Sequence, residues 1–294
     1  MKDRFVGCML GLALGDAMAA PYEGGVLERA VWALLSVGKG LVWSDDTQMS
    51  MALAGSLIRN GRVEQHDLAA SWAQAMEWRR GYGPGVAKLL KKVRAGEDWR
   101  AANRAVFPDG SFGNGAAMRA APVGLFYHRK PDLIRFEAER SAEITNAHPL
   151  GMEGAVLIAH AAAMALTGRL DLGSLREGCR LEEYSTRLEA ARELLSGEPS
   201  LDEVRERLGS SVKAQESVVT AVYAFCRFQG RFEPMVEFII SLGGDTDTIA
   251  AMAGALFGAA NGVRALPQDK LARLDACGEL EALGAGLFRA CPSG

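Results

Sequence analysis

The sequence contains little of the chemistry that builds disulfide frameworks or zinc sites. Its 294 residues include five cysteines and four histidines. The cysteine count is odd, the spacing is wide and no Cys-x-x-Cys pair occurs, so the pattern predicts free thiols in a reducing compartment, which we take to be the cytoplasm. With so few imidazoles, a histidine-rich metal site is not expected either.

A strong excess of either charge is also missing. Lysine and arginine total 33 against 36 aspartate and glutamate residues, which gives a formal net charge of -3. Because no basic face or basic juxtamembrane cluster occurs, we expect neither a sequence-specific nucleic-acid partner nor a membrane partner. A small anionic ligand would have to be held by local groups.

Few stretches alternate polar and apolar residues, and no long linker or low-complexity segment divides the chain. Hydrophobic residues make up 49% of the sequence, enough for a large core. Helical periodicity therefore predicts an all-α protein with a single domain over residues 1–294. The expected helices span residues 4–18, 45–59, 68–79, 85–95, 116–126, 130–145, 149–166, 183–195, 201–208, 217–228, 233–242, 247–260 and 267–276.

The first 20 residues allow two interpretations. Two basic residues, an apolar stretch and a small-residue triplet resemble a signal peptide. However, Gly7, Gly11 and Gly15 recur every fourth residue, so they share one helix face and would let another helix approach closely. Asp16 interrupts the apolar stretch, which is too short to span a bilayer. We expect a buried helix.

Two acidic clusters, at residues 43–47 and 243–248, each open an apolar helix. Each combines two carboxylates with small hydroxyl side chains, the oxygen ligands that Mg²⁺ or Mn²⁺ prefers. The alternative is ordinary helix capping by Asp, Ser and Thr. A cap needs one acceptor, whereas each cluster supplies several, so the repeated surplus favours a cation site.

Two glycine-bearing turns are candidates for ligand contact. Residues 111–119 place two glycines before a helix, an arrangement in which backbone N–H groups can bind an anion, although a plain turn has the same composition. Residues 79–85 offer backbone amides and the ring of Tyr82, which could stack on a base or ribose, or could form an ordinary surface loop.

Two further residues have both a functional and an ordinary interpretation. Glu23 lies in a glycine-flanked turn, where it could act as acid, base or metal ligand, or simply be exposed. His148 begins a helix and could orient a phosphate there. The preferred interpretation is that His148 simply lies at the helix N-terminus and binds no ligand.

Together, six segments in this order resemble the ADP-ribosylglycohydrolase family: residues 7–23, 43–54, 79–85, 111–126, 144–155 and 241–259. The Ser-Asp-Asp-Thr and Gly-Gly-Asp-Thr-Asp-Thr motifs, with Gly-Asn-Gly-Ala-Ala-Met-Arg between them, are the specific part of the resemblance.

The resemblance implies a compact orthogonal multi-helix bundle with a dinuclear metal cleft that holds two Mg²⁺ or Mn²⁺ ions. The implied metal ligands are Ser44, Asp45, Asp46, Asp245, Asp247 and Thr248. The implied catalytic residues are Glu23, Asp46 and Asp245, with Glu23 as ligand or as acid/base at the scissile bond.

The resemblance also implies contacts with ADP-ribose or an ADP-ribosylated substrate. The implied contacts are Tyr82, Gly83, Phe112, Gly113, Asn114, Gly115, Met118, Asn146 and His148. The family commonly has Thr-His where this chain has Thr145 and Asn146, and Asn donates no charge-assisted hydrogen bond. Whether Asn146 or His148 contacts the diphosphate stays open.

By this resemblance the protein is a metal-dependent hydrolase that cleaves the glycosidic bond between ADP-ribose and an acceptor. One alternative is a non-catalytic ADP-ribose-binding or structural, crystallin-like member of the same fold. Another is a dinuclear phosphohydrolase that cuts the pyrophosphate. The acceptor is not encoded in a readable motif: arginine, serine, acetyl ester, nucleobase and polymer linkages share one ADP-ribose pocket.

Overall fold

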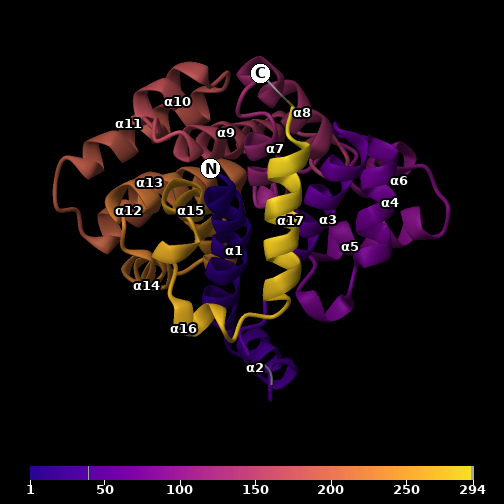
Figure 1. The fold of residues 1–294 in the computed structure, drawn as a ribbon, viewed down its shortest axis with the longest axis horizontal. Coiled ribbons are helices and arrows are strands. Elements are labelled where there is room, and N and C mark those ends of the chain that lie inside the picture. Colours follow the sequence, from indigo (N-terminus) through magenta and orange to yellow (C-terminus); the bar gives the residue numbers. More distant parts are fainter. Residues whose placement is uncertain (39, 293–294) are drawn as a thin grey trace.

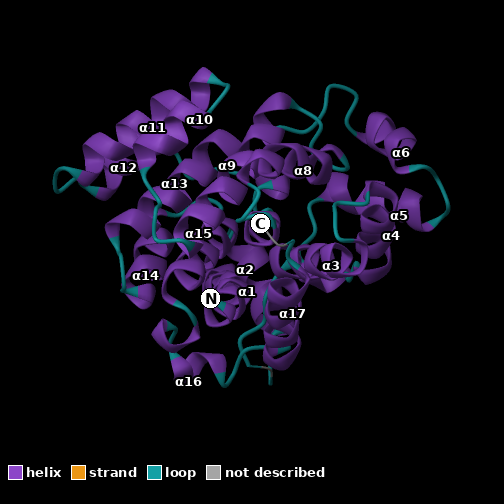
Figure 2. Ribbon diagram, turned by 45° about the horizontal axis from the view of Figure 1, so that its top comes forward, coloured by secondary structure: helices purple, strands orange, loops and turns teal. Residues whose placement is uncertain are grey.

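The computed structural model describes residues 1–38 and 40–292, and over these residues the protein is built of helices, with no extended strand (Figures 1 and 2). The α-helices are α1 (Lys2–Ala19), α2 (Val26–Leu35), α3 (Asp45–Asn60), α4 (Gln65–Ala75), α5 (Pro84–Arg94), α6 (Trp99–Val106), α7 (Ala121–Phe126), α8 (Pro131–Glu143), α9 (Pro149–Leu166), α10 (Leu172–Gly178), α11 (Glu182–Leu195), α12 (Leu201–Leu208), α13 (Ala214–Arg227), α14 (Phe232–Leu242), α15 (Thr246–Asn261), α16 (Gln268–Leu271) and α17 (Cys277–Ala290). The all-α prediction is confirmed.

The centre of the fold is an antiparallel pair, α1 and α15, whose backbones touch. A Cβ atom placed on Gly11 would lie 2.2 Å from the carbonyl oxygen of Gly254, and one on Gly254 would lie 2.1 Å from that of Gly11. The same contact recurs between Gly7 and Gly258, at 2.6 Å. No side chain fits at such distances, so the glycines predicted to share a face of α1 are required by this packing.

The direction of this pair matters for the site. The glycines of α1 meet those of α15 in reverse order, so the C-terminal end of α1 lies at the N-terminal end of α15. The hydroxyl of Thr246, in the first turn of α15, donates a hydrogen bond to the carbonyl of Ala19 at 3.3 Å. The segment before residue 20 and the second acidic cluster are therefore neighbours in space.

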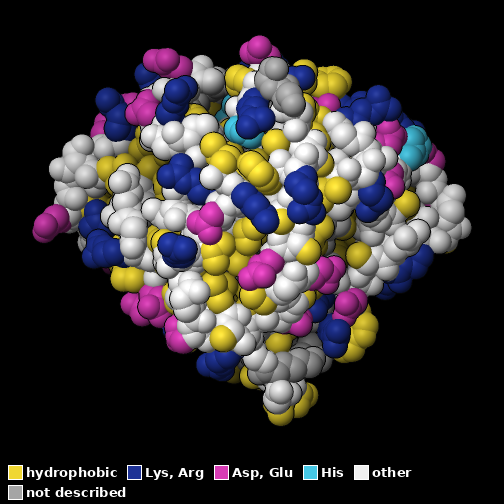
Figure 3. Space-filling model, in the orientation of Figure 1, with side chains coloured by type: hydrophobic (Ala, Val, Ile, Leu, Met, Phe, Trp, Pro, Cys, Tyr) yellow, Lys and Arg dark blue, Asp and Glu magenta, His cyan; other side chains and the backbone are white. Residues whose placement is uncertain are grey.

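The helices α1 and α9 are long and apolar enough, by length and composition, to cross a membrane. In the structure, 78% of the N-terminal window and 72% of the α9 window are buried inside the protein. Burial to this extent is typical of core helices and agrees with the expectation for residues 4–18. Buried apolar side chains from α1, α9 and α15 belong to one continuous core cluster. On the face of the molecule shown in Figure 3, hydrophobic side chains lie between charged ones of both signs.

Three predicted helices are wrong in part. The region 68–79 is α-helical only to Ala75, where α4 ends, and Trp78–Arg80 form a separate 3₁₀ turn. The region 116–126 is not one helix: Asn114–Ala116 form a 3₁₀ turn, and α7 begins only at Ala121. Pro122 explains the break, since proline lacks an N–H group and fits only in the first turn of a helix. In the region 267–276, only α16 is helical.

Four helices, α2, α6, α10 and α17, were not predicted from periodicity. For α17 the reason is its glycine content, which lowers intrinsic helix propensity. One of these glycines, Gly284, faces α1: a Cβ atom there would lie 2.6 Å from the Cα atom of Val6. Packing against α1, which lies beside α17 in Figure 1, outweighs the propensity. The prediction of one domain over residues 1–294 stays a prediction.

We expect Gly11→Ala to lower the free energy of unfolding by about 1–3 kcal/mol or more, because the methyl group overpacks a backbone contact that has no room for it. Gly278→Ala in α17 is the matched control: nothing lies within 4 Å of its Cβ position. That substitution should leave stability unchanged or raise it by up to about 1 kcal/mol. Urea unfolding measures both, and equal stability of the two variants would contradict the packing argument.

Candidate metal centre

The two acidic clusters meet in the structure. Ser44 precedes α3 and its hydroxyl accepts a hydrogen bond from the N–H of Asp46 at 3.2 Å. Asp245 precedes α15, and its N–H donates to the carbonyl of Ser210 at 2.8 Å. The hydroxyl of Thr248, in α15, donates to the Asp46 carboxylate in α3 at 3.3 Å. Two positive helix ends therefore face one pocket of carboxylates.

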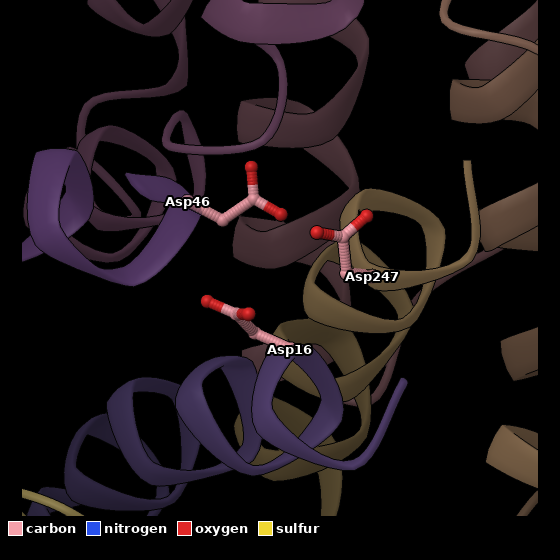
Figure 4. A group of neighbouring side chains, drawn as sticks. All are labelled: Asp16, Asp46 and Asp247. Atoms are coloured by element: carbon pink, nitrogen blue, oxygen red, sulfur yellow. The ribbon is translucent and has the colours of Figure 1, made fainter. Parts of the chain in front are cut away.

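Five carboxylates from three segments group into two sets of three. Oxygens of Asp16, Asp46 and Asp247 all lie within 4.8 Å of one another, and so do oxygens of Glu23, Asp245 and Asp247. Figure 4 shows the first set, with the three side chains pointing toward one another from α1, α3 and α15. Asp247 belongs to both sets, so the two groups of oxygen donors adjoin and together form one candidate metal centre.

One atom provides a test of whether these residues fit a metal ion. The Oδ2 atom of Asp46 is buried and has no hydrogen-bond partner. An unpaired carboxylate oxygen in the interior is unfavourable unless a cation or a proton compensates it. With oxygen donors on every side, the site matches the hard cations Mg²⁺ and Mn²⁺. The residues present therefore fit the implied metal.

The electrostatics of the site are those of crowded carboxylates. Burial raises the pKa of Asp16 to about 6, against the effect of hydrogen bonds from Thr47 and Ser44. Loss of solvation, followed by the charges of Asp16 and Glu23, raises the pKa of Asp45 to about 8. Burial, together with neighbouring carboxylates, holds the pKa of Asp46 and of Asp247 well above the usual range. Ionised together, these groups repel one another unless cations lie between them.

Glu23 lies where it can close over this centre. It is exposed and follows the short 3₁₀ turn Ala20–Tyr22 in an extended conformation. Its carboxylate reaches Asp245 and Asp247 within the distance of the second set. The structure thus brings together the seven residues predicted as metal ligands or catalytic groups at the same end of the α1–α15 pair. Their individual roles stay predictions.

Asn114 links the glycine-bearing loop to the metal centre. Its side-chain amide donates to the Asp245 carboxylate at 2.5 Å and to the hydroxyl of Ser217 at 3.0 Å. Of the other predicted substrate contacts in this loop, Phe112 is half exposed and Met118 is buried. A ligand held over Gly113 and Gly115 would therefore lie directly beside the carboxylates.

The structure places Asn146 and His148 in hydrogen bonds with the protein itself. The buried Asn146 amide donates to the carbonyl of Gly113 at 2.9 Å and to the hydroxyl of Ser111 at 3.2 Å. The Nδ1 atom of His148 accepts from the N–H of Leu150 at 3.1 Å, so this imidazole caps α9. Asn146 therefore holds the loop over residues 111–115 through these two hydrogen bonds. Contact of Asn146 or His148 with a diphosphate stays a prediction.

The two remaining predicted contacts, Tyr82 and Gly83, lie in loop 79–85, which adjoins α3. The hydroxyl of Tyr82 donates to the side-chain oxygen of Gln48 at 2.9 Å, and burial raises the pKa of this phenol. Gly83 precedes α5 and is exposed, with open space around its Cβ position. Loop 79–85 therefore joins α3 through Tyr82 and leaves the backbone at Gly83 accessible.

Sequence reasoning did not assign Asp16 or Arg119 to the site. Asp16 is fully buried, and the available signal was a single charge inside an apolar, glycine-spaced helix. Arg119 is also fully buried: it donates to the carbonyl of Gly115 at 2.6 Å and to the hydroxyl of Thr145 at 2.7 Å, and it stacks over the ring of Trp72. Burial lowers the pKa of Arg119 to about 9. Arg119 therefore joins the loop at Gly115 to the segment at Thr145.

These features define a helical protein whose helix N-termini gather oxygen donors suited to a hard cation. Over residues 1–294 the chain matches the ADP-ribosylglycohydrolase family, and it belongs to that family. The resemblance carried by the six segments is thereby confirmed.

Individual relatives align over nearly the whole chain. ADP-ribosylhydrolase ARH3 of Mus musculus is 33% identical, with 98% of this chain and 91% of the mouse protein covered. The Homo sapiens protein of the same name is 32% identical, with 98% and 93% covered. A solved structure described as an ADP-ribosylglycohydrolase-related protein complex has a TM-score of 0.76 and 28% identity, with 99% of both chains covered.

We expect Mg²⁺ or Mn²⁺ to raise the melting temperature more at about pH 8 than at about pH 5.5. The pKa values of Asp16 and Asp45 in the folded protein, about 6 and about 8, exceed the ordinary 3.8. The metal-free folded state therefore binds more protons than the unfolded state, and its stability falls as the pH rises from about 4 to about 8. A cation offsets this loss where the carboxylates are ionised and competes with protons below that range.

Thermal scans with and without metal at both pH values measure the difference. Sodium chloride at matched ionic strength is the control, because general screening would act on all surface charges. An equal gain from metal at the two pH values would contradict this account.

Proposed function

We propose that the protein is a Mg²⁺- or Mn²⁺-dependent hydrolase that cleaves the N- or O-glycosidic bond between ADP-ribose and an acceptor. The single observation that carries the proposal is the pair of carboxylate sets that share Asp247, in a chain that belongs to the ADP-ribosylglycohydrolase family. Relatives at about one-third identity are named ADP-ribosylhydrolases, which supports the same reaction here.

Two helix starts would hold the cations. The proposed ligands are Ser44, Asp45 and Asp46 from the start of α3, and Asp245, Asp247 and Thr248 from the start of α15. When bound, the paired ions supply positive charge that orients ribose hydroxyls and a water molecule near the anomeric carbon. The protein contributes a rigid arrangement of donors, because both helix starts are fixed to α1.

Glu23 is proposed to move the proton. Cleavage of a glycosidic bond passes through an oxocarbenium-like state, and a carboxyl group must protonate the leaving group or deprotonate the attacking water. Glu23 is the exposed carboxylate of the second set, while Asp245 and Asp247 are buried. An exposed side chain on a short loop can approach a substrate that enters from solvent.

The loop over residues 111–115 is proposed to bind the diphosphate. Asn146, Arg119 and Asn114 fix the conformation of this loop through hydrogen bonds, and the N–H groups of Gly113 and Asn114 donate to the Ser111 hydroxyl and the Val212 carbonyl, so the loop is ordered before a ligand arrives. Ordering a loop in advance lowers the entropy lost on binding. The half-exposed ring of Phe112, packed edge-on against His148 with ring centroids 5.8 Å apart, adds an apolar surface beside it.

We expect purified protein with Mg²⁺ to release free ADP-ribose from at least one member of a substrate panel, and EDTA to abolish the release. The panel contains ADP-ribosyl-arginine, an ADP-ribosyl-serine peptide, O-acetyl-ADP-ribose and poly-ADP-ribose, and chromatography identifies the product. Asp247→Asn should reduce the rate by more than the 10–100-fold typical of outer-shell changes in metal sites. Asp132→Asn, an exposed aspartate in the first turn of α8, is the control and should retain full activity.

Other products would identify the rival functions. AMP among the products would show cleavage of the pyrophosphate instead. Calorimetric binding of ADP-ribose without turnover of any substrate would favour a non-catalytic binding protein.

We expect Glu23→Gln to lower kcat by about 10²–10⁴-fold, because the amide keeps the shape of the side chain but cannot transfer a proton. If Glu23 acts on the proton, KM should change much less than kcat. Initial-rate kinetics on the active panel member separate the two constants. Wild-type kcat in this variant would assign the proton transfer to another group.

A further inference from the structure

Asp16 lies at the point where three helices meet. It follows Gly15 in the last part of α1 and is fully buried. Both of its carboxylate oxygens accept from the N–H of Ser44, at 2.9 and 3.0 Å. Its Oδ2 atom also accepts from the N–H of Thr47 at 3.1 Å and from the Thr47 hydroxyl at 2.5 Å. One side chain of α1 therefore holds the whole first turn of α3.

This attachment differs from an ordinary helix cap. Ser44 already caps α3 from within the chain, through the N–H of Asp46. Asp16 adds a second cap from another helix and satisfies the N–H of Thr47, which would otherwise be an orphan at the N-terminus. The position and direction of the first turn of α3 are thereby fixed relative to α1 as well as relative to its own loop.

The start of α15 is also attached to the last turns of α1. Next to Asp16, a Cβ atom on Gly15 would lie 2.1 Å from the carbonyl oxygen of Ala250 in α15. The Thr246 hydroxyl reaches back to the carbonyl of Ala19. The starts of α3 and α15 are thus both anchored to the last turns of α1, one through a carboxylate and one through backbone contact.

The charge of Asp16 needs an explanation that capping alone does not give. A neutral Ser, Thr or Asn side chain caps a helix about as well as Asp. Asp16 places a buried carboxylate within 4.8 Å of oxygens of Asp46 and Asp247. Figure 4 shows the three side chains pointing toward one another. In the absence of a cation this proximity is repulsive. A carboxylate at this point is favourable only as part of an arrangement that also contains positive charge.

We propose that Asp16 is the positioning residue of the metal centre: it fixes the start of α3 at the separation from α15 at which Asp46 and Asp247 can share cations. The inference rests on the proposed metal-dependent function and adds to it the element that sets the geometry. Both oxygens of Asp16 accept hydrogen bonds from the start of α3, so its role in this proposal is exerted through Ser44 and Thr47, while Asp46 and Asp247 would supply the oxygens that bind the cations.

The test compares metal binding by four variants with that of the wild-type protein. Asp16→Asn removes the charge, and Thr47→Val removes only the hydroxyl that donates to Asp16, whereas Thr47→Ser restores it. Ser56→Ala is the matched control, since Ser56 is another buried α3 hydroxyl that donates to a carboxylate, Asp67, at 2.6 Å. Titration calorimetry with Mn²⁺ gives the affinity, and electron paramagnetic resonance of the Mn²⁺-loaded protein reports the coupling between two neighbouring ions.

We expect Asp16→Asn and Thr47→Val each to weaken Mn²⁺ binding by about 10–100-fold and to alter the spin coupling of the ion pair. Thr47→Ser and Ser56→Ala should match the wild type in both measurements. Because Thr47 contacts no cation in this account, its effect reports positioning alone, and it remains informative if Asp16→Asn fails to fold.

Three results would overturn the inference in distinguishable ways. Wild-type affinity and coupling in Thr47→Val, together with lost binding in Asp16→Asn, would make Asp16 a direct ligand. Wild-type behaviour in both variants would give Asp16 a purely structural role and leave the proposed function intact. Absence of a coupled Mn²⁺ pair in the wild-type protein would remove the inference and the proposed metal dependence together.

Discussion

The contact between the backbones of α1 and α15 is the constraint on which the rest of the structure depends. It exists because the facing positions are glycine or alanine, and it leaves no freedom for one helix to slide along the other. The candidate metal centre lies at the end of this pair, so the packing of α1 against α15 determines the positions of the carboxylates in the site. Catalytic and binding groups carried on such rigid elements hold their geometry better than groups on loops.

The centre itself works against the stability of the fold. Four buried or half-buried aspartates of α1, α3 and α15 and the Asp245 carboxylate crowd one pocket, and Arg119 is the buried cation whose charge acts on Asp45 and Asp46. The apolar core holds these groups together despite their repulsion. Unfavourable local arrangements of this kind persist where the surrounding structure over-determines them, and they are typical of functional sites.

Sequence patterns predicted much of the fold because the core helices are long and strongly periodic. The long buried helix over residues 149–166 has the predicted span, and so has the short, mostly exposed helix over residues 201–208. Where prediction failed, tertiary packing decided: α17 contains three glycines that disfavour an isolated helix, and one of them, Gly284, is needed for the close contact with α1. The two acidic clusters were visible because each offered more oxygen donors than a cap requires.

The role of Asp16 was hidden because its partners lie 28 and 31 residues away, and a lone charge in an apolar run does not reveal them. For Asn146 the family resemblance suggested ligand contact, whereas its amide donates to Ser111 and Gly113 of the neighbouring loop. Local sequence does not encode the direction in which a loop side chain points; the neighbouring loop does.

Because α1 and α15 lie far apart in the sequence, the contact between them has a consequence for biosynthesis. The Thr246 hydroxyl and the Ala19 carbonyl that it contacts are 227 residues apart, so α1 leaves the ribosome long before its partner helix. Until residues 245–261 follow, the glycine face of α1 lacks its partner helix, and Asp16 has only its contacts with the start of α3. Non-local contacts of this kind close late in folding and expose the nascent chain to aggregation. The candidate cation centre can therefore assemble only when synthesis is nearly complete, and a truncated chain that ends before α15 would contain only half of the proposed ligands.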